Sequence, residues 1–289
     1  MTESRLHHVH ALSPSGLHRV AYREWGDAGN PRVLVCVHGL TRQGRDFEPL
    51  ALRLRSHYRV VAPDIVGRGD SDWLPDPAGY ALPQYVADMV VLLARLNVPE
   101  VDWVGTSMGG LIGLALASLP HSPVRRLVLN DVGPSLEWAA LSRLGSQVGQ
   151  AMHFADEAQA ARALREVSMG FGDFTDAEWL AFNRPMLRPA EGGGVRLHHD
   201  PAIAHNLQAL TPAIAAAGEV QLWDAYDRLR RPTLLLRGAN SDLITAETAQ
   251  AMAARGPKAR VVTLPGVGHA SMLDREAQWT PLEGFLFAP

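Results

Sequence analysis

Gly105, Ser107 and Gly109 have the spacing G-x-S-x-G. The motif follows a short apolar run, residues 101–104, and precedes an apolar stretch with the pattern of a helix. A strand, a sharp turn and a helix in this order project the serine hydroxyl from the end of the strand, and the two small residues let neighbouring backbone pass close by. This context predicts that Ser107 is a nucleophile. The alternative is a glycine-rich turn between a strand and a helix, without chemistry.

The hydroxyl of a serine is a weak nucleophile at neutral pH, so Ser107 needs a base. Among the 12 histidines, His269 is the best placed. It lies in the loop Gly-Val-Gly-His-Ala at 266–270, after the last apolar run and before a helix that we expect near residue 272. This loop should leave the sheet at the same edge as Ser107. We therefore predict that His269 accepts the serine proton.

A catalytic histidine needs a carboxylate that holds its tautomer and stabilises the imidazolium. Two aspartates qualify, because each follows an apolar run at the same expected edge: Asp242 after residues 233–236, and Asp131 after residues 126–129. We favour Asp242, because Ser, Asp, His is the chain order used by folds with this strand, turn and helix. Asp131 is the alternative acid, and its other interpretation is a turn or helix-capping residue.

Acyl transfer also needs hydrogen-bond donors for the oxyanion that develops on the substrate. One is the backbone N–H of Met108, the residue after the predicted nucleophile. The second should come from the loop after the apolar run 33–37, which reads His38-Gly39-Leu40. Gly39 lets the backbone turn, so the N–H of Leu40 is the expected donor. His38 is expected to support this loop.

The elements that position these residues follow from the apolar runs. Six apolar runs span residues 32–37, 58–62, 101–104, 126–129, 233–236 and 260–264. Most of them lack polar alternation, as parallel strands buried on both faces do. Helical patterns lie between them. This alternation predicts an α/β fold with an open, mostly parallel sheet and helices on both faces. Residues 9–12 and 18–25 are expected to form a hairpin on one edge of the sheet.

One interval of about 100 residues separates the run that ends near residue 130 from the run that starts near 233. A parallel crossover needs only about a dozen residues, and this interval has helical stretches broken by glycines. We expect a helical insertion over the sheet at 133–230, with 1–132 and 231–289 as the core. Its large apolar side chains can line a pocket or pack inside the insertion: Trp138, Met152, Phe154, Met169, Phe171, Phe174, Trp179, Phe182 and Met186.

The composition excludes several classes of protein. With 27 Lys and Arg residues against 30 Asp and Glu residues, the formal net charge is −3, which argues against nucleic acid or an anionic membrane as a partner. No run approaches the ~20 apolar residues of a membrane-spanning helix. Cys36 is the single cysteine, so no intramolecular disulfide can form. We expect a cytoplasmic protein.

Taken together, these motifs resemble the α/β-hydrolase fold in its serine esterase and lipase-like branch with a helical cap. The resemblance rests on His38-Gly39, the loop 64–72 (similar to D-x-x-G-x-G-x-S-D), Gly105 to Gly109, Asp242 and His269. It implies an eight-stranded sheet, a helical cap after the sixth strand and a Ser-Asp-His triad. The expected activity is hydrolysis of a small-molecule carboxylic ester through an acyl-enzyme intermediate, with neither a cofactor nor a metal ion.

Other functions of this fold stay open. Alternative substrates are lactones (including enol-lactones), thioesters, peptides and carbon–carbon bonds of ring-cleavage products, and an alternative of another class is a ligand-binding protein on a hydrolase scaffold. A carbon–carbon hydrolase needs a cation for the carboxylate of its substrate, and the candidates are Arg42, Arg45, Arg68 and Arg184. For Arg68, a salt bridge within its own loop is the expected role.

Overall fold

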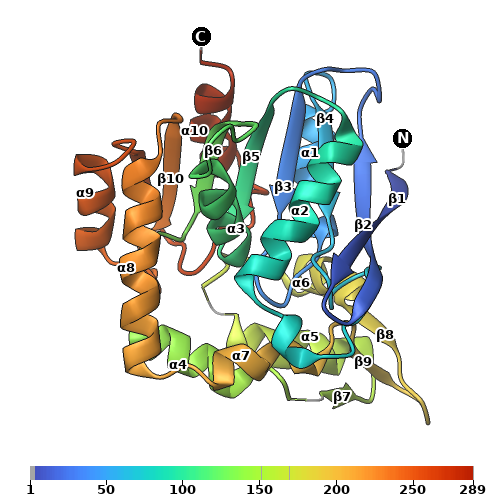
Figure 1. Ribbon diagram of the computed structural model, residues 1–289. Helices are drawn as coiled ribbons and strands as arrows, with labels where there is room; N and C mark the ends of the chain where they lie inside the picture. Colours follow the sequence, from blue (N-terminus) through green and yellow to red (C-terminus); the bar gives the residue numbers. More distant parts are fainter. Residues whose placement is uncertain (1–3, 151, 169, 289) are drawn as a thin grey trace.

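The computed structural model describes residues 4–150, 152–168 and 170–288. Its centre is an eight-stranded sheet with the strand order β1-β2-β4-β3-β5-β6-β10-β11 (Figure 1). The strands are β1 Arg5–Ser13, β2 Gly16–Trp25, β3 Val33–Val37, β4 Arg59–Pro63, β5 Val101–Thr106, β6 Val124–Asn130, β10 Thr233–Gly238 and β11 Arg260–Leu264. The pairs β1–β2 and β2–β4 are antiparallel, and the other pairs in this sheet are parallel. The predicted fold class and the N-terminal hairpin are confirmed.

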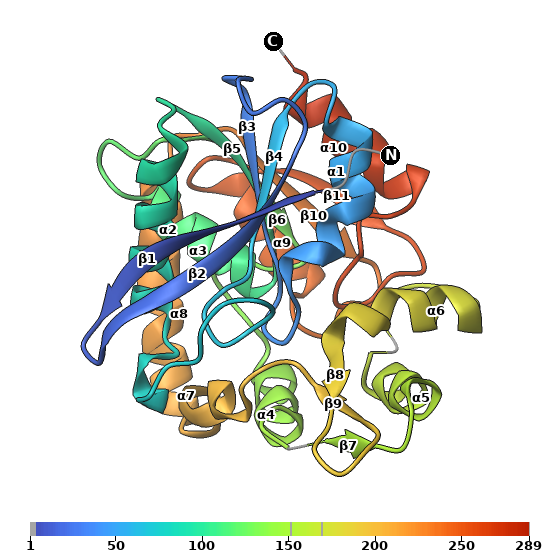
Figure 2. The same ribbon diagram turned by 90° about the vertical axis from the view of Figure 1, so that its right-hand side faces the viewer.

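Helices cover both faces of this sheet, as Figure 2 shows in a view along it. They are α1 Glu48–Leu54, α2 Leu82–Leu96, α3 Met108–Ala117, α8 Pro212–Arg228, α9 Ala246–Ala254 and α10 Glu276–Leu286. Alternate residues of β3 point to opposite faces. Val33, Val35 and Val37 pack into the cluster with α2 and α3, whereas Leu34 and Cys36 pack into the cluster with α1 and α10. Burial on both sides explains why this strand lacks polar alternation.

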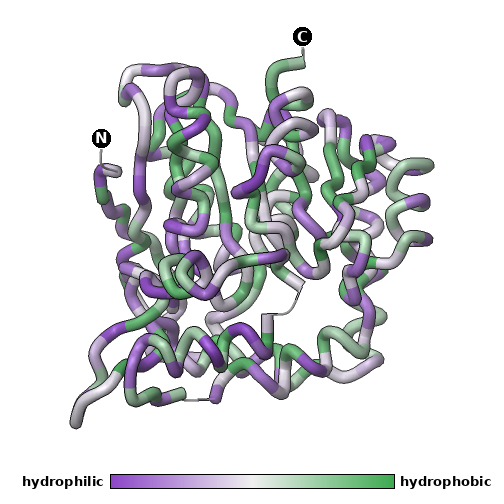
Figure 3. Tube along the Cα trace, turned by 180° about the vertical axis from the view of Figure 1, so that it is seen from behind, coloured by the Kyte–Doolittle hydropathy of each residue, from purple (hydrophilic) through white to green (hydrophobic). Residues whose placement is uncertain are grey.

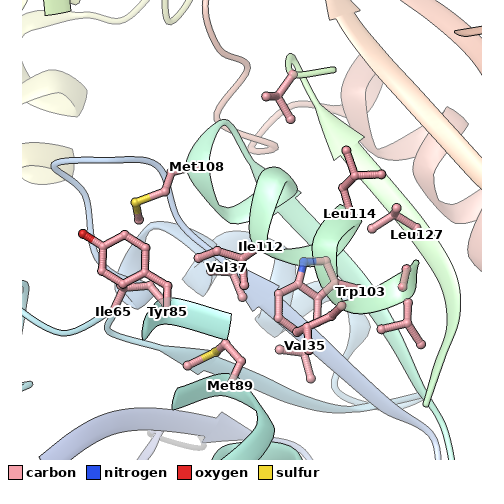
Figure 4. Packing of buried hydrophobic residues seen from close by; sticks show 14 of the residues in the cluster. Val35, Val37, Ile65, Tyr85, Met89, Trp103, Met108, Ile112, Leu114 and Leu127 are labelled. Atoms are coloured by element: carbon pink, nitrogen blue, oxygen red, sulfur yellow. The ribbon is translucent and has the colours of Figure 1, made fainter. Parts of the chain in front are cut away.

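The strand that carries the predicted nucleophile packs closely against the helix that follows it. Trp103 of β5 is fully buried and lies beside Ile112 of α3 and Val35 of β3 (Figure 4). Its indole N–H donates to the carbonyl oxygen of Gly109 at 3.0 Å. This hydrogen bond ties the first turn of α3 to β5, so the turn between them is held from both sides.

The chain leaves the sheet after β6 and returns to it at β10. Between them lie α4 Trp138–Gln147, β7 His153–Phe154, α5 Glu157–Val167, α6 Asp176–Asn183, β8 Leu187–Pro189, β9 Val195–Leu197, α7 His205–Gln208 and α8. In Figure 1 most of this segment lies across the lower end of the sheet, and α8 then runs upward beside α3. Figure 3 shows hydrophilic and hydrophobic positions alternating along its helices, as expected where one face of a helix is buried.

The insertion also contains a small antiparallel sheet, in the order β7-β9-β8, which the sequence analysis did not predict. Its strands have two or three residues each, which is too short for an alternating pattern to stand out. The described part of the chain also has four short 3₁₀ helices: η1 Gly44–Phe47, η2 Pro77–Gly79, η3 Arg184–Met186 and η4 Pro201–Ala204. Among the described residues, no helix combines the length and the apolar character needed to cross a membrane.

Candidate active site

Ser107 lies in a strained turn between β5 and α3. Its φ of 52° and ψ of −119° fall in a region that residues other than glycine rarely adopt. A Cβ atom at Gly105 would lie 2.3 Å from the carbonyl oxygen of Gly109, and a Cβ atom at Gly109 would lie 2.1 Å from that of Val37. Both glycines of the motif are therefore required by close backbone contacts.

The structure brings His269 to this turn. His269 follows β11, and its Nε2 lies 3.0 Å from Oγ of Ser107. Its Nδ1 lies 2.8 Å from Oδ2 of Asp131, which follows β6. Three loops that are far apart in the sequence thus place a hydroxyl, an imidazole and a carboxylate in one hydrogen-bonded row. Such a row is the arrangement in which a serine can be activated by a histidine.

The partner of His269 corrects our preference for Asp242. Asp131 is fully buried; it also accepts the backbone N–H of Gly238 at 2.7 Å and the hydroxyl of Ser241 at 2.6 Å. Asp242 instead forms an ion pair with Arg143 of α4, and its side chain is 53% exposed. The loop after β10 turns so that Ser241, not Asp242, points toward β6. The alternative acid of the sequence analysis therefore occupies the position beside His269.

The loop after β3 lies against the serine. A Cβ atom at Gly39 would lie 3.6 Å from Cβ of Ser107. Within the described part of the chain, the N–H of Leu40 makes no backbone or side-chain hydrogen bond. Met108 is the first residue of α3, where an N–H has no acceptor within the helix. Both predicted oxyanion donors thus belong to segments next to Ser107.

His38 supports this loop from behind. Its Nδ1 lies 2.7 Å from the carbonyl oxygen of Gly39, and its Nε2 accepts the backbone N–H of Ile65 at 2.9 Å. Burial lowers the pKa of His38 to about 3, and the nearby charges of Arg68 and Arg42 act in the same direction. The ring is therefore neutral, and its contacts match the supporting role that the sequence predicts.

Arg68 has a role that the sequence did not reveal. Its side chain is completely buried, and it makes no ion pair within the described residues, so the expected salt bridge is absent there. Nε donates to the carbonyl oxygen of Leu40 at 2.8 Å, and Nη2 lies 3.7 Å from the sulfur of Met108. Nη1 donates to Val66 and Tyr85. The guanidinium thus contacts both segments that carry the predicted oxyanion donors.

The other arginines considered as carboxylate anchors are paired with acidic side chains. Arg42 lines the cavity but forms two hydrogen bonds to Asp46, at 2.7 and 2.9 Å. Arg45 pairs with Glu48, and Arg184 pairs with Glu157. Within the described residues, each of these three arginines thus has a carboxylate partner.

A cavity of about 230 Å³ opens over Ser107 and His269. Its walls are mostly apolar and come from the insertion as well as the sheet edge. Insertion residues in the lining include Leu144, Val148, Met152, Leu164, Phe171, Met186, Leu197 and His199. Typical ligand pockets start near 300 Å³, so this one suits a small substrate.

Most of the large side chains predicted in the insertion either line the cavity or pack inside the insertion. Met152, Phe171 and Met186 line the cavity. Trp179 and Phe182 of α6 pack against each other and against Phe174, which precedes that helix. The remaining three are Phe154, which is buried, Trp138, which is exposed, and Met169, which lies outside the described residues.

The described residues contain no cluster of three or more His, Cys, Asp or Glu side chains that could hold a metal ion.

Comparisons with known proteins place this chain among the alpha/beta hydrolases. A sequence model described as the alpha/beta hydrolase family matches residues 34–280. The 3-hydroxybutyrate-oligomer hydrolase of Cupriavidus necator is 50% identical over 277 residues, which cover 95% of this chain and 94% of that protein. A pimeloyl-[acyl-carrier protein] methyl ester esterase of Xanthomonas campestris is 30% identical over 257 residues, covering 86% and 92%. The crystal structure of an alpha/beta hydrolase from Novosphingobium aromaticivorans, 37% identical, superimposes with a TM-score of 0.86 over 99% of both chains.

Proposed function

We propose that this chain, which belongs to the alpha/beta hydrolase family and is a carboxylic ester hydrolase, cleaves short oligomers of 3-hydroxyacids such as 3-hydroxybutyrate. The observation that carries the proposal is the row of Ser107, His269 and Asp131 below a small cavity. The substrate class is supported by the relative that is 50% identical over nearly its whole length. The small apolar cavity is compatible with short aliphatic units.

In the proposed mechanism, His269 takes the proton of Ser107 while the serine oxygen attacks the ester carbonyl carbon. Asp131 holds the imidazole and stabilises its positive charge. The backbone N–H groups of Leu40 and Met108 stabilise the oxyanion of the tetrahedral intermediate. The bond between the carbonyl carbon and the ester oxygen then breaks, and His269 gives its proton to that oxygen. The hydroxyacid departs with a free hydroxyl group, and an acyl group remains on Ser107. Water, activated by His269, releases that acyl group and regenerates the serine.

A carbon–carbon hydrolase is the less supported alternative, because the relative that is 50% identical is named as a hydrolase of 3-hydroxybutyrate oligomers, whose units are joined by ester bonds. Arg42 lines the cavity but is already paired with Asp46. Arg68 is buried behind the oxyanion segments and does not line the cavity. These arginines do not separate the two substrate classes, because a 3-hydroxybutyrate dimer also carries a carboxylate.

The experiment compares wild type, Ser107→Ala and Ser118→Ala on the dimer of 3-hydroxybutyrate, with released monomer measured by chromatography. We expect Ser107→Ala to lower kcat by a factor on the order of 10⁴–10⁶, because the acyl-enzyme cannot form. Ser118, at the far end of α3, bonds only within its helix, so Ser118→Ala should retain wild-type turnover. Cleavage of simple esters but not of the dimer by wild type would overturn the substrate class. Near-normal turnover by folded Ser107→Ala would overturn the mechanism.

We also propose that the enzyme acts in the cytoplasm on small-molecule substrates. The one cysteine, Cys36, is buried in β3 and needs no oxidising compartment. Fractionation of cells that express the protein with its native ends checks this location, and recovery outside the cytoplasmic fraction would contradict it.

A further inference from the structure

His199 is an unsatisfied polar side chain in the wall of the cavity. It follows β9, lines the same cavity as Ser107 and is only 6% exposed. Its Nδ1 is buried without a hydrogen-bond partner. Its Nε2 makes no hydrogen bond to any residue that the structure describes. Of the described residues with a buried, unpartnered side-chain nitrogen or oxygen, His199 alone lines this cavity. Such atoms are rare in folded proteins, because losing hydrogen bonds to water without replacement costs free energy.

The backbone around His199 is firmly attached to the core. His199 forms an isolated antiparallel bridge with Arg68. The N–H of Asp200 donates to the carbonyl oxygen of Gly67 at 2.8 Å, and the hydroxyl of Tyr80 donates to Asp200 at 2.5 Å. The imidazole is therefore held by fixed backbone, as a recognition group must be if it is to be ready before the substrate arrives.

The same contacts place His199 beside the reaction centre. Arg68, which pairs with the backbone of His199, reaches the carbonyl oxygen of Leu40 and the sulfur of Met108. These two residues carry the predicted oxyanion donors. Arg68 thus connects His199 with the two segments that would hold the scissile carbonyl.

The ring of His199 is neutral under physiological conditions. Burial lowers the pKa of His199 to about 4, with the charge of Arg68 as the next cause. A neutral imidazole has one nitrogen that donates and one that accepts a hydrogen bond. It can therefore pair with a hydroxyl or an ester oxygen.

We propose that His199 is a specificity-determining residue that hydrogen-bonds the oxygen on carbon 3 of the acyl unit of the substrate. This inference rests on the proposed function. It assigns to one side chain the preference that we expect of the enzyme for hydroxyacyl over plain acyl esters. The atom that meets the substrate is Nε2, since Nδ1 is enclosed by protein. A plain acyl chain would leave Nε2 unpaired, whereas a 3-hydroxyacyl chain supplies an oxygen for it. A site built to pair with a hydroxyl discriminates strongly against a substrate that lacks it.

The experiment uses two substrates that differ by one oxygen: 3-hydroxybutyryl-3-hydroxybutyrate and butyryl-3-hydroxybutyrate. Both release 3-hydroxybutyrate, so the leaving group and the assay are the same. The variants are His199→Leu, His199→Asn and the control His198→Leu. His198 is the adjacent residue with a buried, unpartnered Nδ1, but it is not part of the cavity lining.

We expect wild type to prefer the hydroxyacyl substrate in kcat/KM. His199→Leu should lower kcat/KM for that substrate about tenfold or more and leave the butyryl substrate unchanged or improved. His199→Asn should recover part of the preference, and His198→Leu should keep the wild-type ratio. An equal loss on both substrates by His199→Leu, or a wild type without preference, would overturn the inference while the esterase function stands. If wild type cleaves neither substrate, both the proposed substrate class and this inference are overturned.

Discussion

His38 is a buried histidine whose ring connects two loops at the edge of the sheet. One nitrogen faces the carbonyl of Gly39, and the other accepts the N–H of Ile65. A charged ring would lose the second hydrogen bond, because both nitrogens would then be donors. Burial and this geometry act together to keep the ring neutral. The residue thus stabilises the loop that carries Leu40 without taking part in proton transfer.

This environment predicts a pH dependence of stability. The pKa of His38 is lowered from 6.5 to about 3 in the folded protein, so below pH 6.5 the unfolded chain binds a proton that the folded chain does not. The free energy of unfolding should therefore fall on acidification from about pH 6.5, by about 1.4 kcal/mol per pH unit for this one group. Its stabilising contribution is complete above pH 6.5 and is lost by about pH 3.

The measurement is urea denaturation of wild type and His38→Asn at several pH values between 4 and 7. Asparagine retains an amide N–H for the carbonyl of Gly39 but does not titrate. We expect the variant to show a slope of unfolding free energy against pH that is smaller by about one proton. Equal slopes for the two proteins would contradict the assignment of a buried neutral His38.

At the scale of the element, the turn from β5 to α3 depends on backbone contacts that leave no room for side chains. β5 lies beside β3 in the sheet, and the start of α3 passes over the end of β3. Gly109 is therefore pressed against the carbonyl of Val37. The G-x-S-x-G pattern could be recognised from the sequence because this crowding is a local consequence of strand, turn and helix.

Gly109→Ala should disturb this packing. The added Cβ would lie 2.1 Å from the carbonyl oxygen of Val37, so backbone must move, and we expect the free energy of unfolding to fall by about 1–3 kcal/mol. Turnover should fall as well, because Val37 leads into the oxyanion loop. Gly218→Ala on α8 is the matched control: its Cβ would meet no atom within 4 Å, and alanine favours a helix interior by about 0.5–1 kcal/mol. Thermal and urea denaturation compare the two, and an unchanged Gly109→Ala would contradict the crowding.

At the scale of the whole molecule, the sequence predicted what depends on local pattern. The strands, the N-terminal hairpin, Ser107 and His269 follow from apolar runs and from loops at the ends of strands. The aspartate that pairs with His269 could not be predicted in this way. Asp131 and Asp242 follow the neighbouring strands β6 and β10, and both lie between Ser107 and His269 along the chain. Chain order cannot separate them; the conformation of the loop after β10 does.

The roles of Arg68 and His199 were also beyond sequence reasoning. Arg68 acts through contacts with Leu40, Tyr85 and Met108, which lie in three other segments. The place of His199 depends on its contact with the loop after β4, about 130 residues away in the sequence. No local pattern encodes such a contact. The cavity wall therefore depends on how the insertion packs over the sheet.

The central claim is that Ser107, His269 and Asp131 act as one unit, and the most direct test compares Asp131→Asn with Asp242→Asn. We would measure kcat on p-nitrophenyl butyrate, with thermal unfolding to confirm that both variants are folded. Asparagine at 131 would remove the negative charge beside His269 and its hold on the tautomer, so kcat should fall by about 10⁴. Asp242 faces Arg143 at the surface, and such pairs contribute little, so Asp242→Asn should keep turnover within about twofold of wild type. A large loss in Asp242→Asn together with near-normal turnover in folded Asp131→Asn would contradict the account.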